Sequence, residues 1–224
     1  MITFNDATKT YPFGKGNSVP ALRGVSLEIG LGEFIIVVGR SGSGKTTLLN
    51  LAAGLTRPTS GSVMIDGTDL WGVNDQEQSQ LRSQKIGFVF QFPSLLPALT
   101  TYENVLVPTI FRSKRETTNG KDQERAVQLL HEVGLDDKRT AYPRQLSAGQ
   151  QQRVVIARSL MNHPQILLAD EPTSNLDENT EMEIMALFRD LHSRLGITIV
   201  MVTHTRQLVS YGTREIEMAN GRIL

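Results

Sequence analysis

The sequence FIIVVGRSGSGKT, residues 34–46, decides the fold of this chain. Its first five residues, Phe34–Val38, are continuously apolar, as in a strand that is buried on both faces. A glycine-rich turn follows, and then a helical pattern over residues 45–53 that ends at Gly54. Residues 39–46 match G-x-x-x-x-G-K-[ST], the pattern of a phosphate-binding P-loop between a strand and a helix.

The chemistry of phosphate binding explains these residue types. Glycines let backbone N–H groups turn toward an anion without Cβ clashes, and the following helix adds its positive N-terminal end. The Lys45 ammonium can reach the β- and γ-phosphates of a nucleotide, and the Thr46 hydroxyl can ligate Mg²⁺. A turn that binds nothing is the alternative, but the strand before it and the helix after it favour a nucleotide site. The predicted nucleotide-binding residues are Gly39, Arg40, Ser41, Gly42, Ser43, Gly44, Lys45, Thr46 and Thr47.

Outward from this loop, apolar strand patterns alternate with helical ones. The expected strands are residues 25–29, 62–65, 86–90, 166–169 and 197–202, and residues 178–191 form a helix with one apolar face. The pair Asn220-Gly221 between short apolar segments predicts a hairpin. This alternation predicts an α/β fold with a mainly parallel central sheet.

The middle of the chain, residues 102–160, has no strand pattern. Residues 124–133 predict an amphipathic helix that Gly134 ends, and the polar stretch 112–122 predicts a mobile surface loop. We therefore expect a single domain over residues 1–224. Its core comprises residues 1–91 and 163–224, and a helical subdomain over residues 92–162 is inserted into it.

Two adjacent carboxylates, Asp170 and Glu171, end the strand at residues 166–169. After a P-loop, this arrangement lets the first carboxylate hold Mg²⁺ through its water shell, opposite Thr46. Glu171 then points elsewhere and can polarise, as a general base, a water in line with the γ-phosphate. A solvated acidic strand end is the alternative, which the upstream P-loop makes the weaker interpretation.

A second helix start follows Leu146. Ser147 and two small residues, Ala148 and Gly149, precede a helical run over residues 154–161. Such a start attracts anions, although a serine N-cap without a ligand is the plain alternative.

Taken in order, these and other features resemble the ATP-binding-cassette (ABC) ATPases, the nucleotide-binding subunits of ABC transporters. The matching features are Tyr11, residues 39–46, Gln91, residues 146–150, 166–171 and 174–177, and His204. The resemblance covers essentially the whole chain. It implies a P-loop NTPase core with an antiparallel β subdomain and a helical subdomain that carries the signature motif. It also implies that ATP and Mg²⁺ bind and that ATP is hydrolysed to drive transport.

The resemblance implies roles for the remaining positions in the chain's own site. Tyr11, in surroundings that look like a loop, would stack on adenine. Gln91 would sense Mg²⁺ and the attacking water, and His204 would contact the γ-phosphate. Glu171, His204 and Gln91 are thus the expected catalytic residues, and Thr46, Gln91 and Asp170 the expected metal ligands.

Residues 146–150, the signature motif, and residues 174–177 would contact a second subunit and its bound ATP. In the family, Ser147, Gly149 and Gln150 bind the γ-phosphate of ATP held by the partner, and Asp177 crosses the interface. Two copies would therefore sandwich two ATP molecules head to tail. The family's usual motif is Leu-Ser-Gly-Gly-Gln, and Ala148 replaces its first glycine. If that position needs a positive φ, alanine costs on the order of 1 kcal/mol, whereas in a helical conformation it is harmless.

Within the family, residues 22–27, 86–91 and 95–105 resemble the branch of lipoprotein-release and macrolide-export ATPases, which also holds a cell-division ATPase. The branch implies a separate transmembrane permease with an extracytoplasmic domain, and export as the function. The alternative is an ATPase that regulates cell-wall hydrolysis through a membrane partner. Pro93 departs from the branch's usual pattern in the loop that meets this partner, which leaves the partner's identity open.

Composition limits the other classes of function. Lys and Arg together number 23, as do Asp and Glu, so the formal charge of zero disfavours a nucleic-acid binder. The chain has no cysteine, which excludes disulfides, zinc–thiolate sites and a cysteine nucleophile. No apolar run approaches the roughly 18 residues of a membrane span, and the first residues do not resemble a signal peptide. We expect a protein held by its permease at the cytoplasmic face of the inner or plasma membrane, without a nucleic-acid partner.

Overall fold

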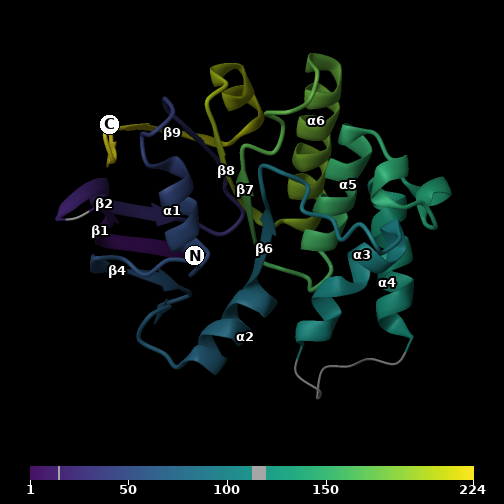
Figure 1. Ribbon diagram of the computed structural model, residues 1–224, viewed down its shortest axis with the longest axis horizontal. Coiled ribbons are helices and arrows are strands. Elements are labelled where there is room, and N and C mark those ends of the chain that lie inside the picture. Colours follow the sequence, from purple (N-terminus) through teal and green to yellow (C-terminus); the bar gives the residue numbers. More distant parts are fainter. Residues whose placement is uncertain (15, 113–119) are drawn as a thin grey trace.

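The computed structural model describes residues 1–14, 16–112 and 120–224, and its elements form two sheets and a helical region (Figure 1). The central sheet has six strands in the order β10-β9-β3-β8-β7-β6, in which β3, β9, β8, β7 and β6 are parallel neighbours and β10 is antiparallel. Their bounds are β3 Phe34–Val38, β6 Ile86–Val89, β7 Ile166–Asp170, β8 Thr198–Thr203, β9 Arg214–Ala219 and β10 Arg222–Ile223. The mainly parallel sheet expected from the sequence is therefore confirmed.

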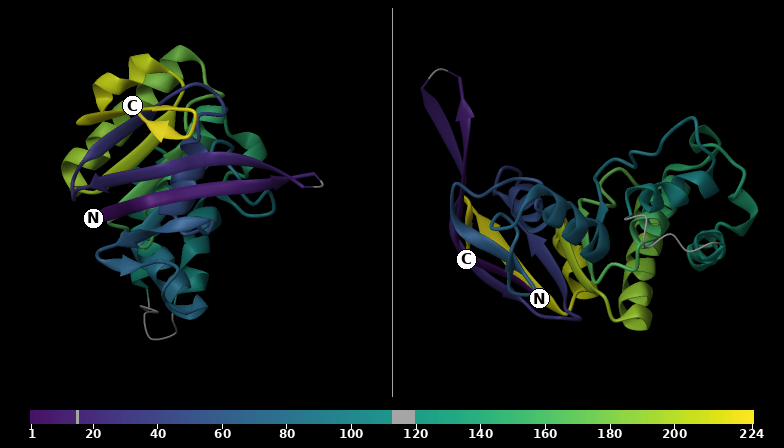
Figure 2. Two further views of the ribbon diagram at one scale, coloured as in Figure 1. Left: turned by 90° about the vertical axis from the view of Figure 1, so that its left-hand side faces the viewer. Right: turned by 90° about the horizontal axis from the view of Figure 1, so that it is seen from below.

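The second sheet is antiparallel, in the order β2-β1-β4-β5. Its strands are β1 Ile2–Phe13, β2 Asn17–Ile29, β4 Ser60–Ile65 and β5 Thr68–Asp69. The far ends of β1 and β2 form an arm that projects beyond the rest of the molecule (Figure 2). This sheet is the antiparallel β part that the resemblance implies.

Helices lie on the central sheet and in the helical region beside it (Figure 1). They are α1 Lys45–Ala52, α2 Asp75–Lys85, α3 Thr101–Leu106, α4 Lys121–Glu132, α5 Ala148–Ser159 and α6 Glu178–Leu195. Short 3-10 turns lie at Val107–Phe111, Asp136–Lys138, Pro143–Gln145 and Arg206–Tyr211. Within the described ranges, no helix is long and apolar enough to cross a membrane.

The apolar run of β3 divides its side chains between two cores. Phe34, Ile36 and Val38 belong, on one face of the sheet, to the core that also contains the apolar faces of α4, α5 and α6. Ile35 and Val37 pack with α1 and the antiparallel sheet on the other. Burial on both faces is why this strand is continuously apolar rather than alternating.

Between β6 and β7 the described residues form helices and turns, with α3, α4 and α5 packed on one another. This agrees with the missing strand pattern in the middle of the chain. Of the expected surface loop over residues 112–122, residues 113–119 lie outside the described part of the structure. The hairpin at Asn220-Gly221 is confirmed, because φ is 50° and 77° at these residues between β9 and β10.

Candidate active site

A cleft of about 680 Å³ lies beside the P-loop. It is lined by Tyr11, Val19, Pro20, Ala21, Ser41, Gly42, Ser43, Gly44, Lys45, Thr46, Thr47, Gln91, Glu171 and His204. The P-loop follows β3, Glu171 follows β7, His204 follows β8, and Gln91 comes two residues after β6. The carboxyl ends of four neighbouring parallel strands thus bring these residues together, at the edge where α/β sheets bind ligands.

The P-loop folds around the ammonium of Lys45, which is only 6% exposed. Its Nζ donates to the carbonyl oxygens of Gly39 and Arg40 at 2.7 and 3.2 Å. The hydroxyl of Ser43 is buried and finds no hydrogen-bond partner in the described part of the chain. Gly44, with φ 104°, begins α1 without a side-chain cap. A buried cation, an unpaired hydroxyl and an uncapped helix N-terminus together fit a phosphate group.

The backbone of the P-loop packs closely against β2, β9 and the β9–β10 turn. A Cβ at Gly39 would lie 2.4 Å from the Met218 carbonyl oxygen, and one at Gly44 would lie 2.5 Å from that of Ala21. The N–H of Gly221, in the β9–β10 turn, donates to the Ser43 carbonyl at 3.0 Å. Gly221 therefore supports the site, a role that could not be predicted from the sequence, although the turn itself could.

Asp170, the last residue of β7, and Thr46, in α1, bring two side-chain oxygens together. The Thr46 hydroxyl donates to the Asp170 carboxylate at 3.1 Å. Burial raises the pKa of Asp170, and the neighbouring Glu171 raises it further, while the Thr46 hydrogen bond and Lys45 oppose this shift. A divalent cation would offset this unfavourable charge, and hard oxygen donors are what Mg²⁺ prefers.

Glu171 adopts a left-handed backbone conformation, with φ 46°, directly after the strand. Its N–H still donates to the carbonyl of Val202, so the turn begins only at its own Cα. Its carboxylate lies 2.7 Å from Nδ1 of His204 and 3.9 Å from Nζ of Lys45. A residue held in so sparsely populated a conformation points to function, and here it aims the carboxylate into the cleft.

Gln91 connects the cleft to the segment after β7. Its side-chain Nε2 donates to the Ser174 hydroxyl at 3.4 Å, and its backbone carbonyl accepts from the side-chain amide of Asn175, also at 3.4 Å.

Tyr11 lies in a strand, so its expected loop-like surroundings were wrong. It stands in β1 opposite Val19 of β2, with the Lys9 ammonium 5.1 Å from its ring centroid. The ring is 36% exposed and lines the cleft as an aromatic surface.

Seven expected residues are not among those that line the cleft. Gly39, Arg40 and Asp170 adjoin lining residues in sequence or through the contacts given above, whereas Ser147, Gly149, Gln150 and Asp177 lie at the starts of α5 and α6. Ser147 and Gln150 cap α5 reciprocally, through side-chain oxygens that accept from each other's N–H. Asp177 caps α6 in one direction only, since its carboxylate accepts from both the N–H and the hydroxyl of Thr180.

Ala148 is the first residue of α5 and therefore helical. The structure thus has a helical conformation at this position, in which alanine is harmless, and not a positive φ, which would be costly. The neighbouring Gly149 is the sterically constrained position, since a Cβ there would lie 2.5 Å from Cγ2 of Thr180.

Comparison with known proteins agrees with this geometry. The sequence profile of the ABC transporter family matches residues 22–174. An uncharacterized ABC transporter ATP-binding protein of Thermotoga maritima is 48% identical, over 97% of this chain and 91% of that protein. The lipoprotein-releasing system ATP-binding protein LolD of Bacteroides thetaiotaomicron is 41% identical, over 100% of this chain and 99% of that protein. The macrolide export ATP-binding/permease protein MacB of Rhodopirellula baltica is 45% identical over 100% of this chain, which spans 32% of that longer protein.

A solved structure is similar over the full length. The dimeric structure of the ATP-binding cassette MJ0796, in a post-hydrolysis state bound to ADP and Pi, matches with a TM-score of 0.90 and 42% identity. The match covers 100% of this chain and 96% of that one.

Proposed function

The chain belongs to the ABC transporter family, and from this premise we propose that it powers export by a separate transmembrane permease. It is an ABC-type ATPase that binds and hydrolyses ATP. The observation that carries the proposal is the convergence of Lys45, Glu171 and His204 in one cleft at the strand ends.

Each of these side chains has a place in the hydrolysis. Lys45 binds the phosphates, and its approach to Glu171 leaves the carboxylate facing the same ligand. Glu171 accepts the proton of a water that attacks the γ-phosphate, and His204 orients that carboxylate through their hydrogen bond. Tyr11 holds the adenine ring by stacking.

Mg²⁺ fits the oxygen atoms of Thr46 and Asp170, with the side-chain oxygen of Gln91 as a further ligand. The described residues contain no group of three His, Cys, Asp or Glu side chains that could hold a metal. This agrees with the usual mode of Mg²⁺, which takes one or two carboxylates and completes its shell with substrate phosphates and water. When bound, the ion neutralises charge on the β- and γ-phosphates.

The active unit is a head-to-tail homodimer. Ser147, Gly149, Gln150 and Asp177 lie outside the chain's own cleft, at the N-termini of α5 and α6. The similar cassette MJ0796 is a dimer. In such a dimer the start of α5 meets the γ-phosphate held by the second copy, and Asp177 crosses the interface.

The permease docks beside the helical subdomain, for which we propose residues 92–162, inserted between the core segments 1–91 and 163–224. A groove of about 310 Å³ there is lined by apolar side chains from β6 and the turn after α3, and by the polar residues Ser83, Arg158, Ser159 and Asn162. Of its lining residues, Phe90 and Phe111 are 42 and 74% exposed, and Phe92 and Ile110, close to them in sequence, are 66 and 76% exposed. Apolar side chains gathered in this way mark an interaction surface, here for a helix of the permease at the cytoplasmic face.

Export is the activity named in the similar proteins LolD and MacB. We propose the same class here, with a permease that carries an extracytoplasmic domain. Purifying the chain with its permease and identifying what that domain binds tests this. A lipoprotein or a small efflux substrate supports export, whereas a cell-wall hydrolase identifies the regulatory alternative.

The hydrolytic step is tested with Glu171→Gln, which keeps the size of the side chain and removes its basicity. We expect ATP binding to persist, turnover to fall by roughly 10²- to 10⁴-fold, and an ATP-bound dimer to accumulate in light scattering. Glu215→Gln, an exposed glutamate of β9, is the matched control. Near-wild-type turnover of Glu171→Gln would refute the role of general base.

A further inference from the structure

Arg158, near the end of α5, holds the segment that follows β6. Its Nη1 donates to the Ser94 carbonyl at 3.0 Å, and its Nη2 donates to the Ser94 hydroxyl at 3.2 Å and to the Pro93 carbonyl at 3.5 Å. A planar guanidinium binds several oxygens at once with fixed geometry, which a flexible ammonium does not. Burial lowers the pKa of Arg158, since few other groups offset its removal from water.

The segment is strained at the point where Arg158 holds it. Ser94 has a left-handed backbone, with φ 35°, which a residue other than glycine adopts only at a cost. The residues just after Ser94 are held by the buried side chain of Asn104. It accepts from the N–H of Leu96 and donates to the carbonyls of Leu96 and Leu99. Strain and anchors together indicate a segment with a defined position, not a passive surface loop.

Only two residues, Phe92 and Pro93, separate the anchored Ser94 from Gln91 in the ATP cleft. The other contacts of Gln91, to Ser174 and Asn175, are long at 3.4 Å. The stronger restraint on where Gln91 lies therefore comes from Ser94, and through it from Arg158.

A cavity of about 210 Å³ separates the same segment from the first half of α5. Gln152 lines it, is 2% exposed, and has an Nε2 without a partner in the described part of the chain. Because this half of the helix is loosely packed on the segment, Arg158 is the firm attachment between them.

We propose that Arg158 is a positioning residue for Gln91, and that it ties the placement of Gln91 to that of α5. Residues 148 and 158 are about 15 Å apart along one rigid helix. A movement at the Ser147 end, where the second copy's ATP is proposed to bind, therefore reaches Gln91 through this side chain. The inference rests on the proposed function, in which Gln91 is a ligand of Mg²⁺.

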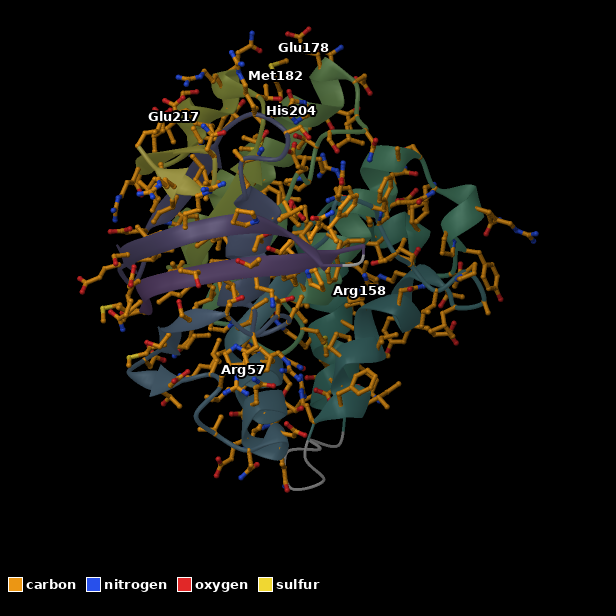
Figure 3. All side chains as sticks on the ribbon, turned by 60° about the vertical axis from the view of Figure 1, so that its left-hand side comes forward. Arg57, Arg158, Glu178, Met182, His204 and Glu217 are labelled. Atoms are coloured by element: carbon orange, nitrogen blue, oxygen red, sulfur yellow. The ribbon has the colours of Figure 1, made fainter. Side chains whose placement is uncertain are left out.

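The test compares Arg158→Met and Arg158→Lys with Arg57→Met, an exposed arginine between α1 and β4; both arginines are labelled in Figure 3. The affinity for a fluorescent ATP analogue is measured in EDTA and across a Mg²⁺ titration, together with thermal unfolding. We expect Arg158→Met to need roughly 10-fold more Mg²⁺ for half-maximal tightening of binding, with affinity in EDTA within about twofold of wild type. Arg158→Lys should fall between, and Arg57→Met should match wild type.

A purely structural role would lower the unfolding temperature of Arg158→Met and leave its Mg²⁺ requirement unchanged, which overturns the proposal. If Arg158→Met does not fold, Arg158→Lys decides by the same criterion. Gln91→Ala tests the role of Gln91 separately from that of Arg158. If it leaves the Mg²⁺ requirement unchanged, the proposed role of Gln91 fails, and if it alone changes that requirement, only the role of Arg158 fails.

Discussion

Asp170 shows how a single residue of the site opposes folding. Its carboxyl group is 9% exposed at the end of β7, and burial raises its pKa above the ordinary value of 3.8. The folded chain therefore binds this proton more tightly than the unfolded chain does, so ionisation lowers the free energy of unfolding. This decrease in the free energy of unfolding is absent below pH 3.8 and grows as the pH rises toward the raised pKa of Asp170. Above that pKa the decrease is complete.

We therefore expect Asp170→Asn to raise the melting temperature of the nucleotide-free protein at pH 7 by roughly 2–4 °C, equivalent to about 1 kcal/mol. The amide keeps an oxygen for the Thr46 hydroxyl and carries no charge. Thermal unfolding of both proteins between pH 4 and 8 checks this, and the difference should shrink toward the acid end. A less stable variant at pH 7 would show that the carboxylate is favourably paired in the folded chain.

Among elements, the N-termini of α5 and α6 meet where there is no room for a side chain. A Cβ at Gly149 would lie 2.5 Å from Cγ2 of Thr180, a methyl group whose residue is itself fixed by Asp177. We expect Gly149→Ala to lower the free energy of unfolding by about 1–3 kcal/mol, the usual cost of overpacking. Chemical denaturation measures it.

Thr180→Ser is the matched rescue, because serine keeps the hydroxyl bound to Asp177 and lacks the methyl group. In the double variant most of the loss should be recovered. Ala148→Gly is the control at the adjacent position, where we expect at most about 1 kcal/mol of helix propensity to be lost. Equal losses in Gly149→Ala with and without Thr180→Ser would contradict the steric explanation.

The elements that the sequence predicted are those with a strong apolar pattern. The central strands β3, β7 and β8 are buried on both faces, and α6 carries an apolar face, so their residues alone identify them. The helix α2 was missed because Gln78 is its one buried residue. Its stability comes from the Asn74–Glu77 capping box and polar contacts such as Arg82 to Gln78. Only the spacing of Asn74 and Glu77 could have revealed it.

The strand β1 was missed for a different reason. It bears polar residues and has three register shifts against β2, which interrupt the alternation that marks a strand. Tyr11 therefore looked like a loop residue, although β2 fixes its position beside the cleft.

For the whole molecule, the cleft residues that follow β3, β6, β7 and β8 could be predicted, because each lies just after the end of a parallel strand. The cleft residues of the antiparallel strand β2, which are Val19, Pro20 and Ala21, were missed, because nothing in their pattern links them to the P-loop. The contacts behind the P-loop could not, since Gly221 reaches Ser43 from a hairpin 178 residues away in sequence. Nor do the described residues place a ligand at the start of α5, a helix that is capped by its own side chains. Its capping box satisfies the first N–H groups locally, so the element is stable without that ligand.

The proposed composite site predicts complementation between two inactive variants. Lys45→Ala disables the chain's own cleft, and Ser147→Arg disables the surface offered to the second copy. A head-to-tail heterodimer of the two has one site with both defects and one with neither. Random mixing makes half the dimers heterodimers, so we expect about one quarter of wild-type ATPase activity to return.

The matched control mixes Lys45→Ala with Glu171→Gln, whose defects lie in the same cleft, so every site stays defective and no activity should return. If the first mixture is as inactive as this control while light scattering shows dimers, Ser147 acts within its own chain and the head-to-tail arrangement is wrong.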